Sequence, residues 1–209
     1  MRKKGLILLL ISASTFVGCR KGKSNFVLTG IVTDATFSQP LSGGLVKLYE
    51  IQAGGGSQNL VGSFNLGADG QYSFTFPRNQ VENYILVAEK ENYFDNQTII
   101  PFDDLTITED NIINVMTTAK SWAKITLLNI NPQQSDHLTI VKQQGKSGCS
   151  ECCASSQIDF FGAVDTSFYC ANDGNTTYQF LYQLIGTGIQ GIKSEVTTVF
   201  DTTEIILEY

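Results

Sequence analysis

The sequence has few of the residues on which most hydrolytic active sites depend. It contains one histidine, His137, in 209 residues. Zinc hydrolases and Ser–His–Asp or Cys–His catalysis need a histidine beside further ligands or a nucleophile. His137 closes the polar segment Gln133–His137 after Pro132, where we expect a solvated loop side chain. We therefore predict no catalytic residues and a protein that is not an enzyme.

Helical patterns and charge are also scarce. Charged residues make up 16% of the chain, prolines number four, and no segment of 12 residues or more after residue 18 shows a clear 3.6-residue apolar period. Glycine, threonine and aromatic residues are frequent, and hydrophobic residues reach 42%. This composition is typical of an exported β protein and differs from that of a disordered chain. We predict an all-β fold.

The body of the chain has few basic residues. The whole sequence has 14 Lys and Arg against 20 Asp and Glu, a net charge of −6. Three of the basic residues, Arg2, Lys3 and Lys4, stand at the N-terminus, so the chain after residue 18 carries −9. Phosphate contacts depend on clustered Lys and Arg. We expect no nucleic-acid partner.

The N-terminus has the layout of a secretory signal peptide. The basic residues Arg2–Lys4 precede the apolar stretch Leu6–Val17, and Gly18 and Cys19 follow. A 12-residue helix would rise about 18 Å, short of the ~30 Å hydrocarbon core, so the stretch cannot be a permanent transmembrane helix. An ordinary cleaved signal is one interpretation. The other follows from Phe16–Cys19, which resembles the lipobox of bacterial lipoproteins with phenylalanine in place of leucine.

The lipobox resemblance, which we prefer, implies a lipid-anchored protein of the cell envelope. It implies that residues 1–18 are a signal peptide, that Cys19 carries a diacylglycerol and an acyl chain such as palmitate, and that residues 19–25 are a tether. Two or more acyl chains hold a protein stably on a membrane. The basic residues of the tether suit anionic headgroups. We expect the outer membrane as the membrane partner.

Short alternating runs divided by turn residues fill the first half of the chain. In Leu45–Ile51, for example, Val46 and Leu48 share one face. Asp69-Gly70 separates two such runs, which is a strong hairpin signal. A helical turn is expected within residues 103–110. The predicted strands are Phe26–Thr33, Leu45–Ile51, Asn59–Asn65, Gln71–Phe76, Tyr84–Lys90 and Gln97–Pro101.

Five segments of the first half carry a distinctive order and spacing, Gly30–Asp34, Gln39–Tyr49, Asp69–Phe74, Tyr84–Lys90 and Asn92-Tyr93. With them, residues 26 to about 101 resemble the carboxypeptidase regulatory-like (transthyretin-like) domain of Bacteroidetes surface proteins, which we place at 26–118. The resemblance implies a seven-stranded Greek-key β-sandwich without catalytic residues or cofactor. In such a domain Pro40–Gly44 would carry the chain to the opposite sheet, Asp69-Gly70 would set a hairpin, and Tyr72 and Phe74 would fill the core.

The second half repeats the pattern of short strands without an obvious sequence repeat. Strands at this spacing predict a second antiparallel sandwich, transthyretin- or immunoglobulin-like, over residues 119–209. The predicted strands are Trp122–Ile130, Leu138–Lys142, Gln157–Phe161, Phe168–Cys170, Thr177–Ile185, Glu195–Val199 and Glu204–Glu208.

Four cysteines gather in the second half, which in an exported chain indicates two disulfides. Bonding Cys152 to Cys153 is sterically awkward, because adjacent Cα atoms lie about 3.8 Å apart. We prefer Cys149–Cys152 with Cys153–Cys170, and Cys149–Cys153 with Cys152–Cys170 remains open. A zinc site or a redox-active CxxC are weaker alternatives, because only one CxxC pair exists and no βαβ context surrounds it.

Two further kinds of site come from exposed side chains. The pairs Asp103-Asp104 and Glu109-Asp110 lack the EF-hand spacing and the six to eight oxygen ligands of calcium, so we predict no metal site. Tyr93 and Phe94, at a strand end, are the best candidates for an exposed aromatic pair that contacts a glycan.

We therefore predict a non-catalytic envelope lipoprotein, a binding, adhesive or accessory module with envelope proteins or glycans as partners. The alternative is a glycan-binding lipoprotein of a carbohydrate-uptake system, and an enzyme is the least favoured hypothesis.

Overall fold

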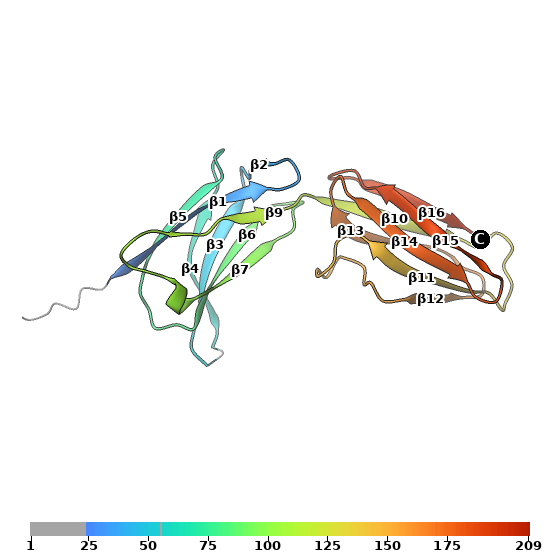
Figure 1. Cartoon of the computed structure of the whole chain (residues 1–209), viewed down its shortest axis with the longest axis horizontal. Helices are drawn as coiled ribbons and strands as arrows, with labels where there is room; N and C mark the ends of the chain where they lie inside the picture. The colour runs from blue at the N-terminus through green and yellow to red at the C-terminus, as the bar shows by residue number, and fades with distance from the viewer. Residues whose placement is uncertain (1–23, 55) are drawn as a thin grey trace, which may run out of the picture.

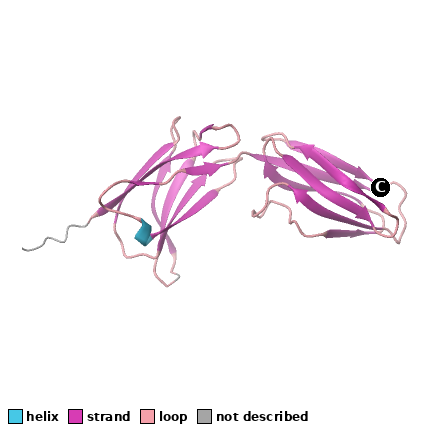
Figure 2. Cartoon of the chain, viewed as in Figure 1, coloured by secondary structure: helices cyan, strands magenta, loops and turns pink. Residues whose placement is uncertain are grey.

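The computed structural model describes residues 24–54 and 56–209, which are almost entirely β-strand and connecting loop (Figure 2). The predicted all-β sandwich class is confirmed. Two successive sandwiches lie end to end, and we call β1–β9 the first unit and β10–β16 the second unit (Figure 1). No helix in the described residues is long and apolar enough to cross a membrane. The predicted lipid site, Cys19, lies outside the described residues.

Two sheets make up the first unit. In one, β1 is the central strand, with β5 antiparallel on one side and the short strands β2, β8 and β9 also paired to it. The other has the order β4-β3-β6-β7. The strands are β1 (Asn25–Asp34), β2 (Gln39–Pro40), β3 (Leu45–Ile51), β4 (Gln58–Asn65), β5 (Gln71–Pro77), β6 (Asn83–Glu89), β7 (Asn96–Pro101), β8 (Asn111–Ile112) and β9 (Val115–Thr117).

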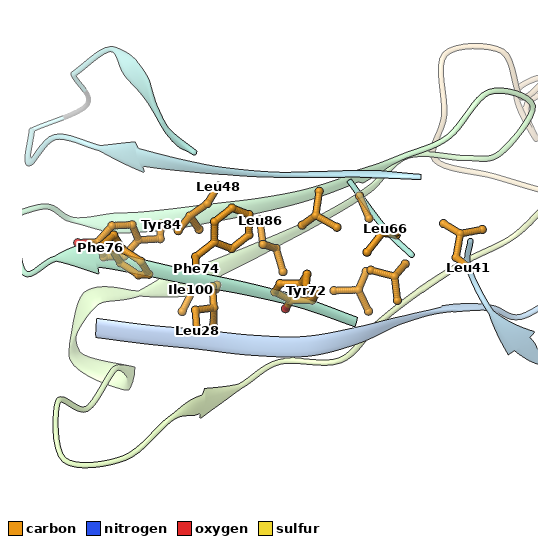
Figure 3. Close-up of a cluster of buried hydrophobic side chains, with 14 of the residues drawn as sticks. Leu28, Leu41, Leu48, Leu66, Tyr72, Phe74, Phe76, Tyr84, Leu86 and Ile100 are labelled. Atoms are coloured by element: carbon orange, nitrogen blue, oxygen red, sulfur yellow. The ribbon is translucent and has the colours of Figure 1, made fainter. Parts of the chain in front are cut away.

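An aromatic-rich core fills the space between these sheets (Figure 3). Strand β5 alternates buried and exposed residues along its length, so that Tyr72, Phe74 and Phe76 all point inward, as predicted for the first two. Phe76 packs edge-on against Tyr84 with ring centroids 4.9 Å apart, and Phe26 contacts both rings. Such tilted pairs add stabilisation beyond their buried area.

The Asp69-Gly70 hairpin prediction is wrong, because the turn joins strands of different sheets. Strand β4 pairs with β3, whereas β5 pairs with β1. Gly70 has a φ of +64°, and a Cβ there would lie 2.6 Å from the Val32 carbonyl oxygen. Backbone from β1 therefore presses against the turn, and the glycine is needed for the crossing. The Pro40–Gly44 segment behaves as expected and leads from β2 to β3 in the opposite sheet.

The first unit also departs from a seven-stranded, purely antiparallel arrangement. Strands β8 and β9 run parallel to β1, and the two-residue strands β2 and β8 raise the number of strands to nine. The expected helical turn is a 3-10 helix at Phe102–Asp104. Asn111 fixes the return to β1, because its side-chain amide donates to the Val27 carbonyl oxygen at 2.9 Å.

The second unit packs a three-stranded sheet, β13-β10-β16, on a four-stranded sheet, β12-β11-β14-β15. All neighbours are antiparallel except β16, which runs parallel to β10. Its core is separate and mostly aliphatic. The division of the chain into independent domains at residues 118 and 119 stays a prediction. The strands are β10 (Lys120–Leu128), β11 (His137–Gln144), β12 (Ile158–Phe161), β13 (Asp165–Asp173), β14 (Thr177–Leu184), β15 (Ile189–Val196) and β16 (Thr202–Glu208).

Candidate functional site: the stapled loop and the junction of the two units

The four cysteines of the second unit form two disulfides. Cys149 is bonded to Cys152, and Cys153 is bonded to Cys170 of β13. This is the pairing that we preferred from the short loops that it closes. We call residues 145–156 the stapled loop. With all four cysteines in disulfides, none of them is free to bind zinc, and no group of three potential metal ligands lies within the described residues. The redox-active CxxC alternative is not tested by this, because the oxidised form of such a motif is itself a Cys149–Cys152 disulfide.

The stapled loop covers the free edge of β13. The Ala171 N–H donates to the Glu151 carbonyl oxygen at 3.0 Å, and the Cys153–Cys170 bond holds the neighbouring residue in place. An uncovered strand edge is a template for unwanted pairing with other chains. The disulfides therefore hold a polar loop, which has little apolar surface of its own, over a sheet edge that it protects.

A buried lysine organises the interior of the loop. Lys142 is 9% exposed, and its ammonium donates to the carbonyl oxygens of Lys146, at 2.6 Å, and Cys153. Burial lowers the pKa of Lys142, because the charged form loses hydration there. Its polar contacts are backbone carbonyls at both sides of the loop. The side chain therefore bridges the two sides of the loop and holds them at a fixed distance from each other.

The stapled loop also reaches the first unit. Cys152 and Ala171 bury the ring of Phe94, and Trp122 and Cys149 pack around them. The ammonium groups of Lys146 and Lys120 lie 4.6 and 5.3 Å from the centre of the Phe94 ring. Cations over an aromatic face are attracted to it. The disulfide loop of one unit thus encloses an aromatic side chain of the other.

The expectation that Tyr93 and Phe94 form an exposed glycan-contacting pair is wrong. Tyr93 is 6% exposed and Phe94 is 8% exposed, because both lie at the junction of the two units. The Tyr93 hydroxyl donates to the buried Asp34 carboxylate at 2.7 Å, and its ring packs against Phe200 with centroids 5.6 Å apart. Desolvation and the Asp34 charge raise the pKa of Tyr93. Both residues serve the joint between the units.

Polar contacts of the second unit lie beside this junction. Lys146 pairs with Asp173 at 2.9 Å, and the Thr118 hydroxyl donates to the same carboxylate. Lys120 pairs with Glu151 at 2.8 Å. A pocket of about 430 Å³ lies here, and both lysines line it. Because each ammonium already has a carboxylate, the pocket does not offer free positive charge to an anionic ligand.

His137 occupies a different environment from the predicted loop. It begins β11, stacks on Phe161 with centroids 4.3 Å apart, and its Nε2 lies 2.7 Å from an Asp159 carboxylate oxygen. The pKa of Asp159 is lowered by this hydrogen bond and by one from Gln157. The His137 ring stacks on Phe161 because the two residues are directly opposite in the β11–β12 ladder. It is a cross-strand contact at the end of a sheet, where solvent reaches both groups.

A larger cleft lies on the first unit. Its volume is about 730 Å³, and the rings of Phe64 and Tyr72 form part of its wall. Amide and carboxylate side chains also line it, those of Asn65, Asp69, Gln71 and Asn114, together with the hydroxyls of Thr29 and Ser73. Amide and carboxylate groups beside rings are suited to binding polyhydroxylated ligands through hydrogen bonds and stacking. This cleft could not be predicted from the sequence, because its walls come from β1, β4, β5, β8 and the loops after β4 and β8, which only the fold brings together.

Comparison with known proteins identifies no family. No family model matches the chain, and no curated protein matches it. Among solved structures, the shaft pilin SpaA from Lactobacillus rhamnosus GG aligns over 88% of this chain and 97% of its own, with 12% identity and a TM-score of 0.34. The Bacillus anthracis TIE protein is 14% identical, with 88% of this chain and 34% of its own covered and a TM-score of 0.34. The minor pilin GBS52 of Streptococcus agalactiae is 12% identical, with 88% of this chain and 94% of its own covered and a TM-score of 0.34. These values are too low to assign a fold family or a function.

Proposed function

We propose that the protein is a non-catalytic, lipid-anchored module of the bacterial cell envelope that holds an interaction surface away from the outer membrane. The observation that carries this is the end-to-end arrangement of the two units. Strand β1 begins at one end of the molecule and the C-terminus lies in the second unit, at the other end (Figure 1). An anchor before β1 would therefore place the second unit distal to the membrane. We propose further that the first unit is a carboxypeptidase regulatory-like domain.

The junction supports a presenting role, because it is built to resist bending. Aromatic and cation–π contacts cross it, because the Tyr93 ring packs on Phe200 and the Phe94 ring lies under the ammonium groups of Lys120 and Lys146. Both disulfides and the Lys146–Asp173 pair lie within the second unit, where they hold the surface that receives Phe94. Domains within a chain move relative to one another by default unless such an interface holds them. A rigid junction would keep the second unit at a fixed distance and orientation from the anchored end.

The test of the anchor is metabolic labelling of the full chain with a palmitate analogue in a bacterial host that processes lipoproteins. We expect label on the chain, fractionation with membranes, and loss of both on Cys19→Ala. The matched control is Ser24→Ala, at the other end of the tether, which should keep the label. Label that persists in Cys19→Ala would refute lipidation at this residue, and an unlabelled, soluble parent chain would support the ordinary cleaved signal.

A second candidate, glycan binding, is favoured by the cleft of the first unit. We expect titration calorimetry with neutral oligosaccharides to detect binding that Gln71→Ala weakens, because Gln71 lines the cleft and is exposed. Gln58→Ala, on β4 outside the cleft, is the control and should bind as the parent does. Equal binding by the two variants would exclude the cleft as the site.

A further inference from the structure

Strand β15 is an exposed edge of the second unit. It pairs with β14 on one side, and no described strand pairs with its other side. The β14–β15 ladder runs through eight residue pairs without a bulge. Ile192 and Val196 are 58% and 60% exposed, and Ser194 between them is also exposed. A long and regular edge that also exposes apolar side chains favours pairing with a further strand.

The orientation of the β15 backbone follows from a bond at its end. The Thr197 N–H donates to the Thr176 carbonyl oxygen at 2.9 Å, in register with the β14–β15 ladder. In an antiparallel ladder, hydrogen-bonded pairs alternate with pairs that are not bonded to each other. The even-numbered residues therefore point their N–H and C=O groups toward the free edge. Their side chains, including Ile192, Ser194 and Val196, share the outer face of the sheet.

The sequence of β15 is complementary to itself in one register. If two copies pair antiparallel about Ser194, Ile192 of one faces Val196 of the other, and Lys193 of one faces Glu195 of the other. Both contacts occur twice because of the two-fold symmetry. Apolar and opposite-charge pairs directly across a ladder are stabilising. In the described part of the chain, neither Lys193 nor Glu195 forms an ion pair within its own molecule.

Neighbouring registers fit less well. Centring the pair on Ile192 would place Lys193 opposite Gly191 and Glu195 opposite Ile189, so that both charges lose their partners. Centring it on Val196 would move the contact into the loop that follows the strand. The charges on the edge thus act against other registers while they favour one.

We infer that the β15 edge binds the same edge of a second copy of this chain, in an antiparallel register centred on Ser194. The two four-stranded sheets then become one continuous sheet. On its outer face, Leu181 beside Ile192 in the β14–β15 ladder extends the apolar row toward Val196 of the partner copy. Other edges of the second unit suit this less. The stapled loop covers β13, and β12 has only four residues. The remaining edge strand, β16, carries Glu204 and Glu208 and no basic residue, so two copies of it have no opposite charges to pair.

A single cysteine at the symmetry centre tests the register directly. In Ser194→Cys the two Cα atoms would lie about 5.5 Å apart, as in a hydrogen-bonded antiparallel pair, within the range that a disulfide spans. The matched control is Gln190→Cys, on the same strand, face and edge. In this register the two copies of residue 190 lie roughly 26 Å apart, because eight residues separate them along the paired strands.

The full chain is expressed in an oxidising envelope and examined by non-reducing electrophoresis, with the unsubstituted chain as background. We expect a disulfide-linked dimer from Ser194→Cys and background levels from Gln190→Cys. Equal yields from the two variants, or a monomeric Ser194→Cys chain at the parent's abundance, would overturn the inference.

Charge exchange separates pairing from folding. On the Ser194→Cys background, Lys193→Glu brings like charges together twice and should reduce the dimer by about tenfold. Adding Glu195→Lys restores both attractions and should restore the dimer. A double variant that stays as weak as Lys193→Glu alone would contradict the proposed register.

Discussion

The two units reach stability by different means. The first unit buries a large aromatic cluster, in which Phe26, Phe76 and Tyr84 are each at most 3% exposed, and none of its described residues is a cysteine. The second unit has a smaller core, with Tyr178 and Phe180 as its fully packed rings, and it holds both disulfides. Apolar burial stabilises the folded state, whereas a disulfide acts mainly by restricting the unfolded chain. Two sandwiches of similar size are thus stabilised in different ways, one mainly by buried rings and the other by a smaller core together with disulfides.

Each unit also contains a buried polar network, made of neutral side chains in the second unit and centred on a carboxylate in the first. In the second unit, Ser121, Asn172 and Thr197 are fully buried, and the Ser121 hydroxyl and Asn172 amide both donate to the Thr197 hydroxyl oxygen, at 2.7 and 3.0 Å. In the first unit, buried Asp34 accepts bonds from the Tyr93 hydroxyl and from the Thr36 and Phe37 N–H groups. Satisfied networks of this kind specify one packing arrangement. Both lie near the junction, where the apolar cores end.

The largest effect should follow from a deletion in the aromatic core. Phe26→Ala removes a ring that touches Phe76, Tyr84 and Phe102, and should cost about 3–5 kcal/mol of unfolding free energy in denaturant titrations. Trp122 is the only tryptophan in the sequence, lies in β10 and packs beside Phe94 of the first unit, so its fluorescence reports the second unit and the junction. If the units unfold independently, the transition of the second unit should stay at the denaturant concentration of the parent. Leu60→Ala, at a 58% exposed site, is the control and should change stability by less than about 0.5 kcal/mol.

The two disulfides of the second unit should contribute different amounts to its free energy of unfolding. Removing Cys153–Cys170 as the double serine variant frees a loop of 17-residue separation and should cost about 3 kcal/mol, against about 2 kcal/mol for Cys149–Cys152. Thermal and denaturant unfolding of the two double variants measure this difference. The reverse order would show that contacts of the stapled loop, rather than chain entropy, dominate its contribution.

Alkaline pH should weaken both units through their buried tyrosines. Burial raises the pKa of Tyr178 to about 12, from an ordinary value of 10.0. The unfolded chain then loses this proton before the folded chain does. The stabilisation is therefore complete below about pH 10 and disappears as the pH rises toward 12. Denaturant midpoints across this range should fall less steeply in Tyr178→Phe than in the parent, and parallel curves would rule out Tyr178 as a contributor.

The smallest change in stability should come from the junction. Phe200→Ala removes ring contacts to Phe37 and Tyr93 and should cost about 1 kcal/mol. It should also broaden the distance distribution between spin labels on Leu60 and Ile206, one in each unit. Phe161→Ala, a 69% exposed ring at a sheet end, should leave that distribution unchanged. A narrow distribution in Phe200→Ala would show that the stapled loop alone holds the joint.

The strands were predictable where alternation is strong and poorly predictable where glycine interrupts it. Leu45–Ile51 was predicted with the bounds of β3, and Phe26–Thr33 lies within β1. Strand β15 was predicted at Glu195–Val199 but runs through Ile189–Val196, because Gly188 and Gly191 break the apolar pattern at its start. Of the strands that were predicted, the proposed self-association edge is the one whose bounds differ most from the structure, while the short strands β2, β8 and β9 were not predicted.

Side-chain chemistry along the chain determined the class of fold, the preferred disulfide pairing and the buried faces of the best strands, because these depend on local periodicity and on short loops. The tertiary structure decided the rest. It buried Tyr93 and Phe94 between the units, sent Asp69-Gly70 across from one sheet to the other, and left the β15 edge open. Each of these outcomes depends on which distant segments meet, and no local pattern records that.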